Sequence, residues 1–283
     1  MRRVAATIAL LLLLAPRARA VLPGTQYAYD PSSLGLEFTP VTFPSTRDSV
    51  ELRGWWFAGP ANAPVVVLCP RGQGTMADLL PAVREFARRG FEVMTFDLRD
   101  FGPGGPGTAD SLRNLVFASR WVNDTEGAFR FARARAPGRF VFAWGQDLGG
   151  PVAVAAATRA PSSVDAIAVE GLFRSSQDQI AWLGTSQDDE VVLMHRRLVE
   201  TLDEPQSSVS RLTRPLFVIV AGKDEVTPPD ATRLVTTRSR SVIERWELPD
   251  AGHANADQTP GYYDRICDWF RRIGHRLGAP QRR

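Results

Sequence analysis

The sequence predicts an α/β protein with a mostly parallel, eight-stranded sheet covered by helices on both faces. Short runs of β-branched and apolar residues alternate with stretches of helical periodicity, which is typical of parallel strands joined by crossover helices. The chain has 283 residues, of which 44% are hydrophobic. This is enough apolar surface to build a full core in one large domain.

The predicted strands begin with a hairpin pair, and six apolar runs follow it. In chain order they span 36–43, 50–57, 65–69, 91–96, 139–143, 166–169, 216–220 and 242–248. Helical periodicity, with acids and arginines on the outward positions, covers 76–89, 123–136, 148–159, 190–202, 229–236 and 261–276. We therefore predict one domain over residues 21–283, with a short cap segment at about 174–212 between the sixth and seventh strands.

Residues 1–20 have the pattern of a secretory signal peptide. A basic start at Arg2 and Arg3 precedes an apolar stretch over 4–14, and Ala18-Arg19-Ala20 fits the small-x-small cleavage pattern. An apolar run of about 11 to 13 residues is shorter than the roughly 20 that a membrane-spanning helix needs. We expect cleavage near Ala20 and a secreted or periplasmic protein with no stable membrane insertion.

The charge distribution argues against nucleic-acid binding. Four arginines lie in the first twenty residues, and removing them from the formal net charge of +3 leaves −1 for the remainder. A near-neutral body without a basic stripe has no electrostatic surface for a phosphate backbone. The expected partner is a small-molecule substrate, and the sequence does not determine the oligomeric state.

Cysteine and histidine usage predicts neither a metal site nor any other cofactor. The two cysteines, Cys69 and Cys267, are expected to be buried free thiols, although export would also permit a disulfide between them. The three histidines, His195, His253 and His275, are scattered without metal-ligand spacing.

A nucleophile-elbow pattern is the most informative motif. The predicted strand at 139–143 runs into the stretch GQDLGG at 145–150, which opens an Ala/Val-rich helix. Such a turn is so sharp that its flanking positions need glycine, and its central side chain is exposed at the helix start. Asp147 occupies that centre. Asp224 and His253 each follow a later predicted strand, so all three lie at the carboxyl ends of strands, where an open α/β sheet forms its ligand crevice.

These motifs resemble the α/β-hydrolase superfamily over residues 35–275, and within it the compact serine aminopeptidase-like group. The other stretches that carry the resemblance are LRGWW at 52–56, VVVLCPRGQG at 65–74, FDLRDFG at 96–102 and VEGLF at 169–173. The resemblance implies an α/β-hydrolase fold in which Asp147 is at the nucleophile position, Asp224 is the acid and His253 is the general base.

The resemblance also implies a set of supporting groups. The backbone N–H groups of Gln73 and Leu148 would form the oxyanion hole. Glu170 follows the sixth predicted strand, where some dehalogenases of this fold carry their acid, and it is therefore the alternative to Asp224.

Asp147 departs from the serine that this group uses as its nucleophile. A carboxylate that attacked an ester carbonyl would form a mixed anhydride rather than an ordinary acyl-enzyme. It can instead attack a saturated carbon and form an alkyl-enzyme ester, which His253 would open by activating water. Alternatively, Asp147 and His253 could act together as bases on water.

Haloalkane dehalogenases and epoxide hydrolases of this fold use the alkyl-enzyme route, and their elbows resemble this one. The resemblance to each is incomplete. Leu148 and Gln73 replace the usual halide-binding Trp and Asn of the dehalogenases. Residues 175–212 contain no tyrosine to act as the acid of an epoxide hydrolase. The substrate therefore stays undetermined at this stage.

Arg71 is the second departure, because this group usually has histidine there. Its permanent charge could bind an anionic group of a substrate, or it could pair with Asp147 in a site that has lost turnover. A non-catalytic binding protein that keeps the fold is therefore the alternative to a hydrolase. A contact between Arg71 and Asp147 in the crevice would favour the binding protein, whereas His253 between two carboxylates would favour the hydrolase.

Overall fold

The computed structural model describes residues 24–103, 118–183 and 205–278, except 238, 240, 242 and 254. The predicted signal peptide at 1–20 and the predicted helix at 190–202, which contains His195, lie outside the described residues. No helix in the described part of the chain is both long and apolar enough to span a bilayer.

The eight described strands form one sheet in the order β1-β2-β4-β3-β5-β6-β7-β8. β1 pairs antiparallel with β2, β2 pairs antiparallel with β4, and the remaining neighbours are parallel. The strands are β1 (Thr39–Pro44), β2 (Glu51–Phe57), β3 (Val65–Cys69), β4 (Glu92–Phe96), β5 (Val141–Gly145), β6 (Ala166–Glu170), β7 (Leu216–Ala221) and β8 (Ile243–Leu248). The predicted eight-stranded, mostly parallel sheet is confirmed, with strand ends displaced by up to three residues.

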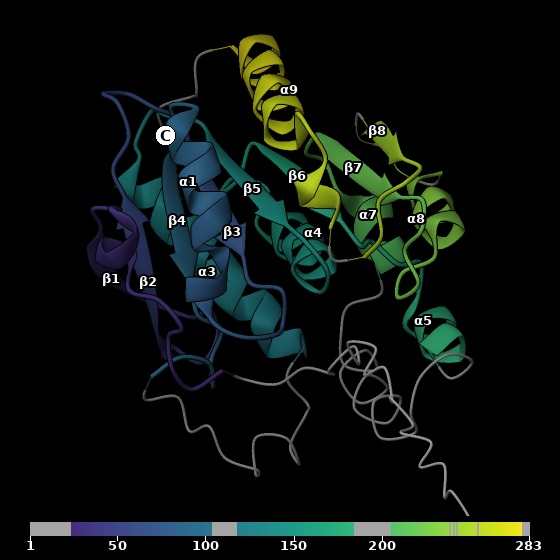
Figure 1. Ribbon diagram of the computed structural model, residues 1–283, viewed down its shortest axis with the longest axis horizontal. Helices are drawn as coiled ribbons and strands as arrows, with labels where there is room; N and C mark the ends of the chain where they lie inside the picture. Colours follow the sequence, from purple (N-terminus) through teal and green to yellow (C-terminus); the bar gives the residue numbers. More distant parts are fainter. Residues whose placement is uncertain are drawn as a thin grey trace, which may run out of the picture.

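Helices cover both faces of the sheet (Figure 1). α1 (Leu80–Arg88) and α9 (Tyr262–Leu277) pack on one face, and α3 (Ala118–Arg135), α4 (Gly149–Arg159) and α7 (Pro205–Arg211) pack on the other. Alternate residues of β3 enter the two cores: Val65 and Val67 face the α3 and α4 side, whereas Val66 and Leu68 face the α1 and α9 side. Every residue of β3 is buried because both of its faces are covered.

α3 begins at Ala118, five residues before its predicted start at 123, and three further helical segments differ from the sequence prediction. The predicted helix at 76–89 is a 3₁₀ turn, η2 (Met76–Leu79), followed by α1. Thr75 and Asp78 form a capping box around η2, and Pro81 has no N–H to donate back into that turn, so a continuous α-helix cannot form. The cap segment contains two short helices that periodicity did not indicate, α5 (Ser176–Leu183) and α7. α8 (Pro229–Thr236) has its predicted bounds.

Both cysteines are buried and free, as expected. Cys69 packs in the core between the sheet and the helices α3 and α4, whereas Cys267 lies on α9 in the core on the opposite face of the sheet. The sheet lies between them, which excludes a disulfide.

Arg99, just after β4, joins α3 to the β1–β2 turn. Its guanidinium donates to Asp124 of α3 at 2.5 Å and to Asp48 of the turn at 2.6 Å. The Arg99 side chain is 6% exposed and that of Asp124 is fully buried. This ion pair therefore belongs to the core rather than to the surface.

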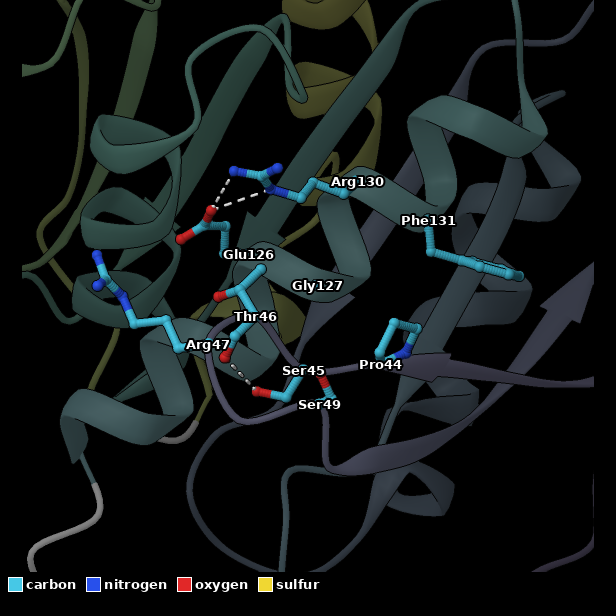
Figure 2. A pocket seen from close by; sticks show the side chains of 9 residues that line it. All are labelled: Pro44, Ser45, Thr46, Arg47, Ser49, Glu126, Gly127, Arg130 and Phe131. Atoms are coloured by element: carbon cyan, nitrogen blue, oxygen red, sulfur yellow. Dashed lines mark hydrogen bonds and ion pairs between the residues drawn. The ribbon is translucent and has the colours of Figure 1, made fainter.

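A surface hollow of about 620 Å³ lies between the β1–β2 turn and α3, and Figure 2 shows the side chains that line it. Within it, Arg130 turns toward Glu126 one helical turn away on α3, at 2.6 Å. Asp147, Asp224 and His253 do not line this hollow. The candidate site is elsewhere, at the carboxyl ends of β5, β7 and β8.

Candidate active site

Asp147 lies in the sharp turn between β5 and α4. Its backbone has a φ of 51°, in the left-handed region that is strained for a residue with a side chain. The turn needs glycine on both sides: a Cβ on Gly145 would lie 2.4 Å from the Gly149 carbonyl oxygen, and one on Gly149 would lie 2.7 Å from the Cys69 carbonyl oxygen. The local backbone is thus an elbow that lifts Asp147 toward the crevice.

His253 lies between two carboxylates. Its Nδ1 is 3.1 Å from Asp224 Oδ2, and its Nε2 is 3.7 Å from Asp147 Oδ2. The structure therefore brings together three residues that are 77 and 29 positions apart in the chain. The order Asp147, His253, Asp224 is that of a nucleophile, a base and an orienting acid. The contact with Asp224 is at hydrogen-bond distance, whereas the contact with Asp147, at 3.7 Å, is longer.

Asp224 is fixed by its own loop. Its Oδ1 accepts hydrogen bonds from the backbone N–H groups of Val226 at 2.8 Å and Thr227 at 2.7 Å, which leaves Oδ2 for His253. The neighbouring Lys223 pairs with Asp250 at 2.8 Å. Asp224 is thus available to orient the imidazole ring.

The carboxylates also control the charge on His253. Burial disfavours the imidazolium, but the charges and hydrogen bonds of Asp147 and Asp224 outweigh burial and raise the pKa of His253 to about 11. At neutral pH, His253 is therefore a cation between two anions.

This charge state predicts a pH-dependent contribution of His253 to stability. The folded-state pKa lies above the unfolded value of about 6.5, so the contribution is complete below pH 6.5 and is lost as the pH rises toward 11. We expect the difference in free energy of unfolding between wild type and His253→Gln to shrink steadily over that range, as measured by urea denaturation. A difference that stays constant from pH 6 to pH 10 would contradict a charged His253.

Glu170 does not take the place of Asp224. At the end of β6 it accepts hydrogen bonds from Tyr262 Oη at 2.8 Å and Gln146 Nε2 at 3.0 Å, rather than from His253. Burial raises the pKa of Glu170 to about 7, against the opposing effect of these two hydrogen bonds. Of the two acids considered from the sequence, the structure sets Asp224 against the imidazole.

Arg71 makes contacts other than the one with Asp147 considered above. Its Nη2 donates to Gln146 Oε1 and lies 3.5 Å from Asp257 Oδ2. The contacts of Arg71 with described residues therefore do not include the pairing with Asp147 that would have favoured a non-catalytic site.

The loop after β3 contacts the elbow. A Cβ on Gly72 would come within 2.9 Å of Leu148 Cδ1, so the loop lies directly against the residue that follows Asp147. The hydrogen bonds among the described residues include none donated by the backbone N–H of Gln73 or Leu148. Their role as the oxyanion donors, which the sequence resemblance implies, stays a prediction.

Sequence reasoning missed Gln146, Asp257 and Tyr262. The only feature of the sequence that could have indicated a role for Gln146 was its position next to Asp147 at the elbow centre. Tyr262 starts an amphipathic helix, where an aromatic residue indicates core packing. The sequence pattern does not indicate its hydrogen bond to Glu170. Asp257 follows His253 by only four residues, but nothing in the local pattern links it to Arg71.

Part of the chain matches a known protein family. A family model described as serine aminopeptidase, S33, matches residues 60–185, a segment that includes the elbow. No curated protein sequence matches the chain.

Several solved structures share the fold. An esterase of Pyrococcus furiosus superposes with a TM-score of 0.71 at 14% identity and covers 91% of this chain and 100% of its own. Acetyl xylan esterase 1 from Thermoanaerobacterium gives 0.62 at 16% identity, covering 88% and 86%. Pyrococcus horikoshii acylaminoacyl peptidase gives 0.61 at 17% identity, covering 86% of this chain but 43% of its own. This chain therefore has an α/β-hydrolase fold, and its residues 60–185 match the serine aminopeptidase family model.

Proposed function

We propose that this protein is a hydrolase that uses Asp147 as its nucleophile, His253 as general base and Asp224 as the acid that orients His253. The observation that carries the proposal is the position of the imidazole, which is 3.1 Å from Asp224 on one nitrogen and 3.7 Å from Asp147 on the other. A surface histidine would not need two buried or half-buried carboxylates aligned with both of its ring nitrogens.

The chemistry of a carboxylate selects the substrate class, a small molecule with a leaving group on a saturated carbon. One oxygen of Asp147 would bond to that carbon, and the leaving group would depart with the electron pair of the broken bond. The product of this step is an ester between Asp147 and the remaining alkyl group.

Water would then attack the carbonyl carbon of this ester, while His253 takes the proton that the water loses. The resulting oxyanion would accept hydrogen bonds from the backbone N–H groups of Gln73 and Leu148. When the bond between the carbonyl carbon and the alkoxy oxygen breaks, the alcohol leaves with the proton from His253. The carboxylic acid that remains at Asp147 then gives its own proton to His253, which restores the carboxylate and the imidazolium.

The effect of the Asp147 and Asp224 charges on the pKa of His253 favours this two-step route. In the free protein the carboxylates hold His253 as an imidazolium, so it cannot take a proton from water. An ester at Asp147 is neutral, and its formation would remove one of the two anions that raise the pKa of His253. Once the ester has formed, His253 would release its proton to the solvent and become a base, which argues against Asp147 and His253 acting together as bases in the free protein.

The N-terminal pattern supports export of this hydrolase. A basic start, a short apolar run and a small-x-small site at 18–20 suit a cleaved signal peptide, so we propose that the enzyme acts in the periplasm or outside the cell.

Trapping the ester tests the proposal. Purified wild type and His253→Ala would be incubated with alkyl halides, epoxides and activated esters, and their intact masses measured. Attack does not need His253 but release does, so an adduct of substrate size should accumulate on Asp147 in His253→Ala and not in wild type. His275→Ala, which removes an exposed histidine on α9, is the matched control and should stay unmodified. If neither adduct nor turnover is found with any compound, the fold serves binding rather than catalysis.

A further inference from the structure

Arg71 contacts both chain segments that carry the proposed reacting pair. It lies just beyond β3, and its Nη2 donates to Gln146, the residue that precedes Asp147 in the elbow. The same nitrogen is 3.5 Å from Asp257, four residues after His253. One guanidinium thus links the elbow to the loop that carries His253.

A buried layer of polar groups fixes the Gln146 end of this link. Gln146 is 6% exposed, and its amide can satisfy both of its partners in only one orientation: Oε1 toward the donor Arg71 and Nε2 toward the acceptor Glu170, at 3.0 Å. Glu170, which is 2% exposed, is itself fixed by Tyr262 at the start of α9. Rotation of the Gln146 amide would set donor against donor at Arg71 and acceptor against acceptor at Glu170, which is costly away from water.

The contacts that hold the Arg71 side chain are made at the end of its guanidinium group. Its Nε is buried and has no hydrogen-bond partner among the described residues, so the described polar contacts of the guanidinium are made by Nη2. Because one nitrogen makes both contacts, a lysine ammonium would keep part of this link, whereas an apolar side chain would bind neither partner.

We propose that Arg71 is a positioning residue, which holds Asp147 and His253 at their separation by tying Gln146 to Asp257. The inference rests on the function proposed above, because it assigns Arg71 to the geometry of that site. Asp147 is at a strained φ and His253 is in a loop after an edge strand, so neither is positioned by regular secondary structure alone. A cross-link between their segments supplies the missing constraint.

The test measures the protonation of His253 without any need for turnover. Nitrogen NMR of ¹⁵N-histidine-labelled protein resolves the three histidines, and His253→Ala assigns the signal of interest. Arg71 could act on His253 as a positioning residue or only as a nearby positive charge, and the two explanations predict opposite changes in the pKa of His253 when Arg71 is replaced. If Arg71 were only a nearby cation, Arg71→Met would raise the pKa of His253. If Arg71 positions the pair, the same variant would weaken the contact with Asp147 and lower that pKa.

We expect Arg71→Met to increase the acid dissociation constant of His253 about tenfold or more, and Arg71→Lys to recover part of the wild-type value. Gln146→Leu changes no charge and should act in the same direction as Arg71→Met. Arg272→Met is the matched control. It removes an exposed arginine of α9 that pairs with Glu244 of β8, and it should change the pKa of His253 little. Melting temperatures would verify that each variant is folded.

An unchanged or raised pKa of His253 in folded Arg71→Met would overturn the positioning role. That outcome is independent of the proposed function, which depends on the trapped ester. If a substrate is found, Arg71→Met should lower kcat with KM within about threefold of wild type, since a residue that aligns the reacting pair does not bind the substrate.

Discussion

Several turnovers in H₂¹⁸O are expected to place ¹⁸O in the carboxylate of Asp147. In the proposed route, water attacks the carbonyl carbon of the Asp147 ester, so the oxygen from water stays with the protein and the alcohol leaves with an oxygen that belonged to Asp147. The labelled carboxylate would be located by mass spectrometry of the peptide that contains residue 147. The peptide that contains Asp250, an exposed carboxylate at 88% side-chain exposure, is the internal control.

Label in the product but none in the Asp147 peptide would show that water attacked the substrate directly, and Asp147 would then be a base. Asp147→Ala should lower kcat/KM by about 10⁴-fold or more in either case, because the loss of a nucleophile or of a principal base removes most of the rate acceleration. The isotope experiment, rather than the alanine variant, therefore decides between the two chemistries. Asp147→Ser would show in addition whether the site supports an ordinary esterase.

Arg99→Met is expected to lose about 3–5 kcal/mol of the free energy of unfolding, the largest effect on stability that we predict. The variant leaves Asp124, which is fully buried, as an unpaired charge in the core between β4 and α3. It also releases Asp48 and so detaches the β1–β2 turn. Urea denaturation followed by tryptophan fluorescence would measure the loss.

Two comparisons isolate the cause of this loss. Arg99→Met combined with Asp124→Asn should recover part of the stability, because the amide keeps an acceptor for the backbone N–H of residue 99 while the buried charge is removed. Arg233→Met breaks ion pairs with Asp230 and Glu247 that lie at the surface, and should cost at most about 1 kcal/mol. A loss below about 1 kcal/mol for Arg99→Met would contradict a core role for Arg99.

The elbow illustrates what can be predicted locally. Gly145 and Gly149 surround Asp147 because a Cβ at either position would collide with backbone, and this requirement is visible in the residue types alone. The strands were also predictable, because parallel strands with both faces covered must be apolar throughout. The 3₁₀ turn before α1 was less visible, since the residues of η2 and α1 share one helical periodicity and only the capping box and Pro81 separate them.

The sequence by itself determined the α/β class, the eight strands and the elbow with Asp147 at its centre, since these follow from hydrophobic periodicity and from steric limits on neighbouring residues. Only the tertiary structure decided that Asp224 rather than Glu170 contacts His253, that Arg71 contacts Gln146 and Asp257, and that the sheet separates the two cysteines. These outcomes depend on which loops meet at the carboxyl edge of the sheet. Which side chains meet there depends on distances in the folded structure, and these distances cannot be read from the spacing of the residues along the chain.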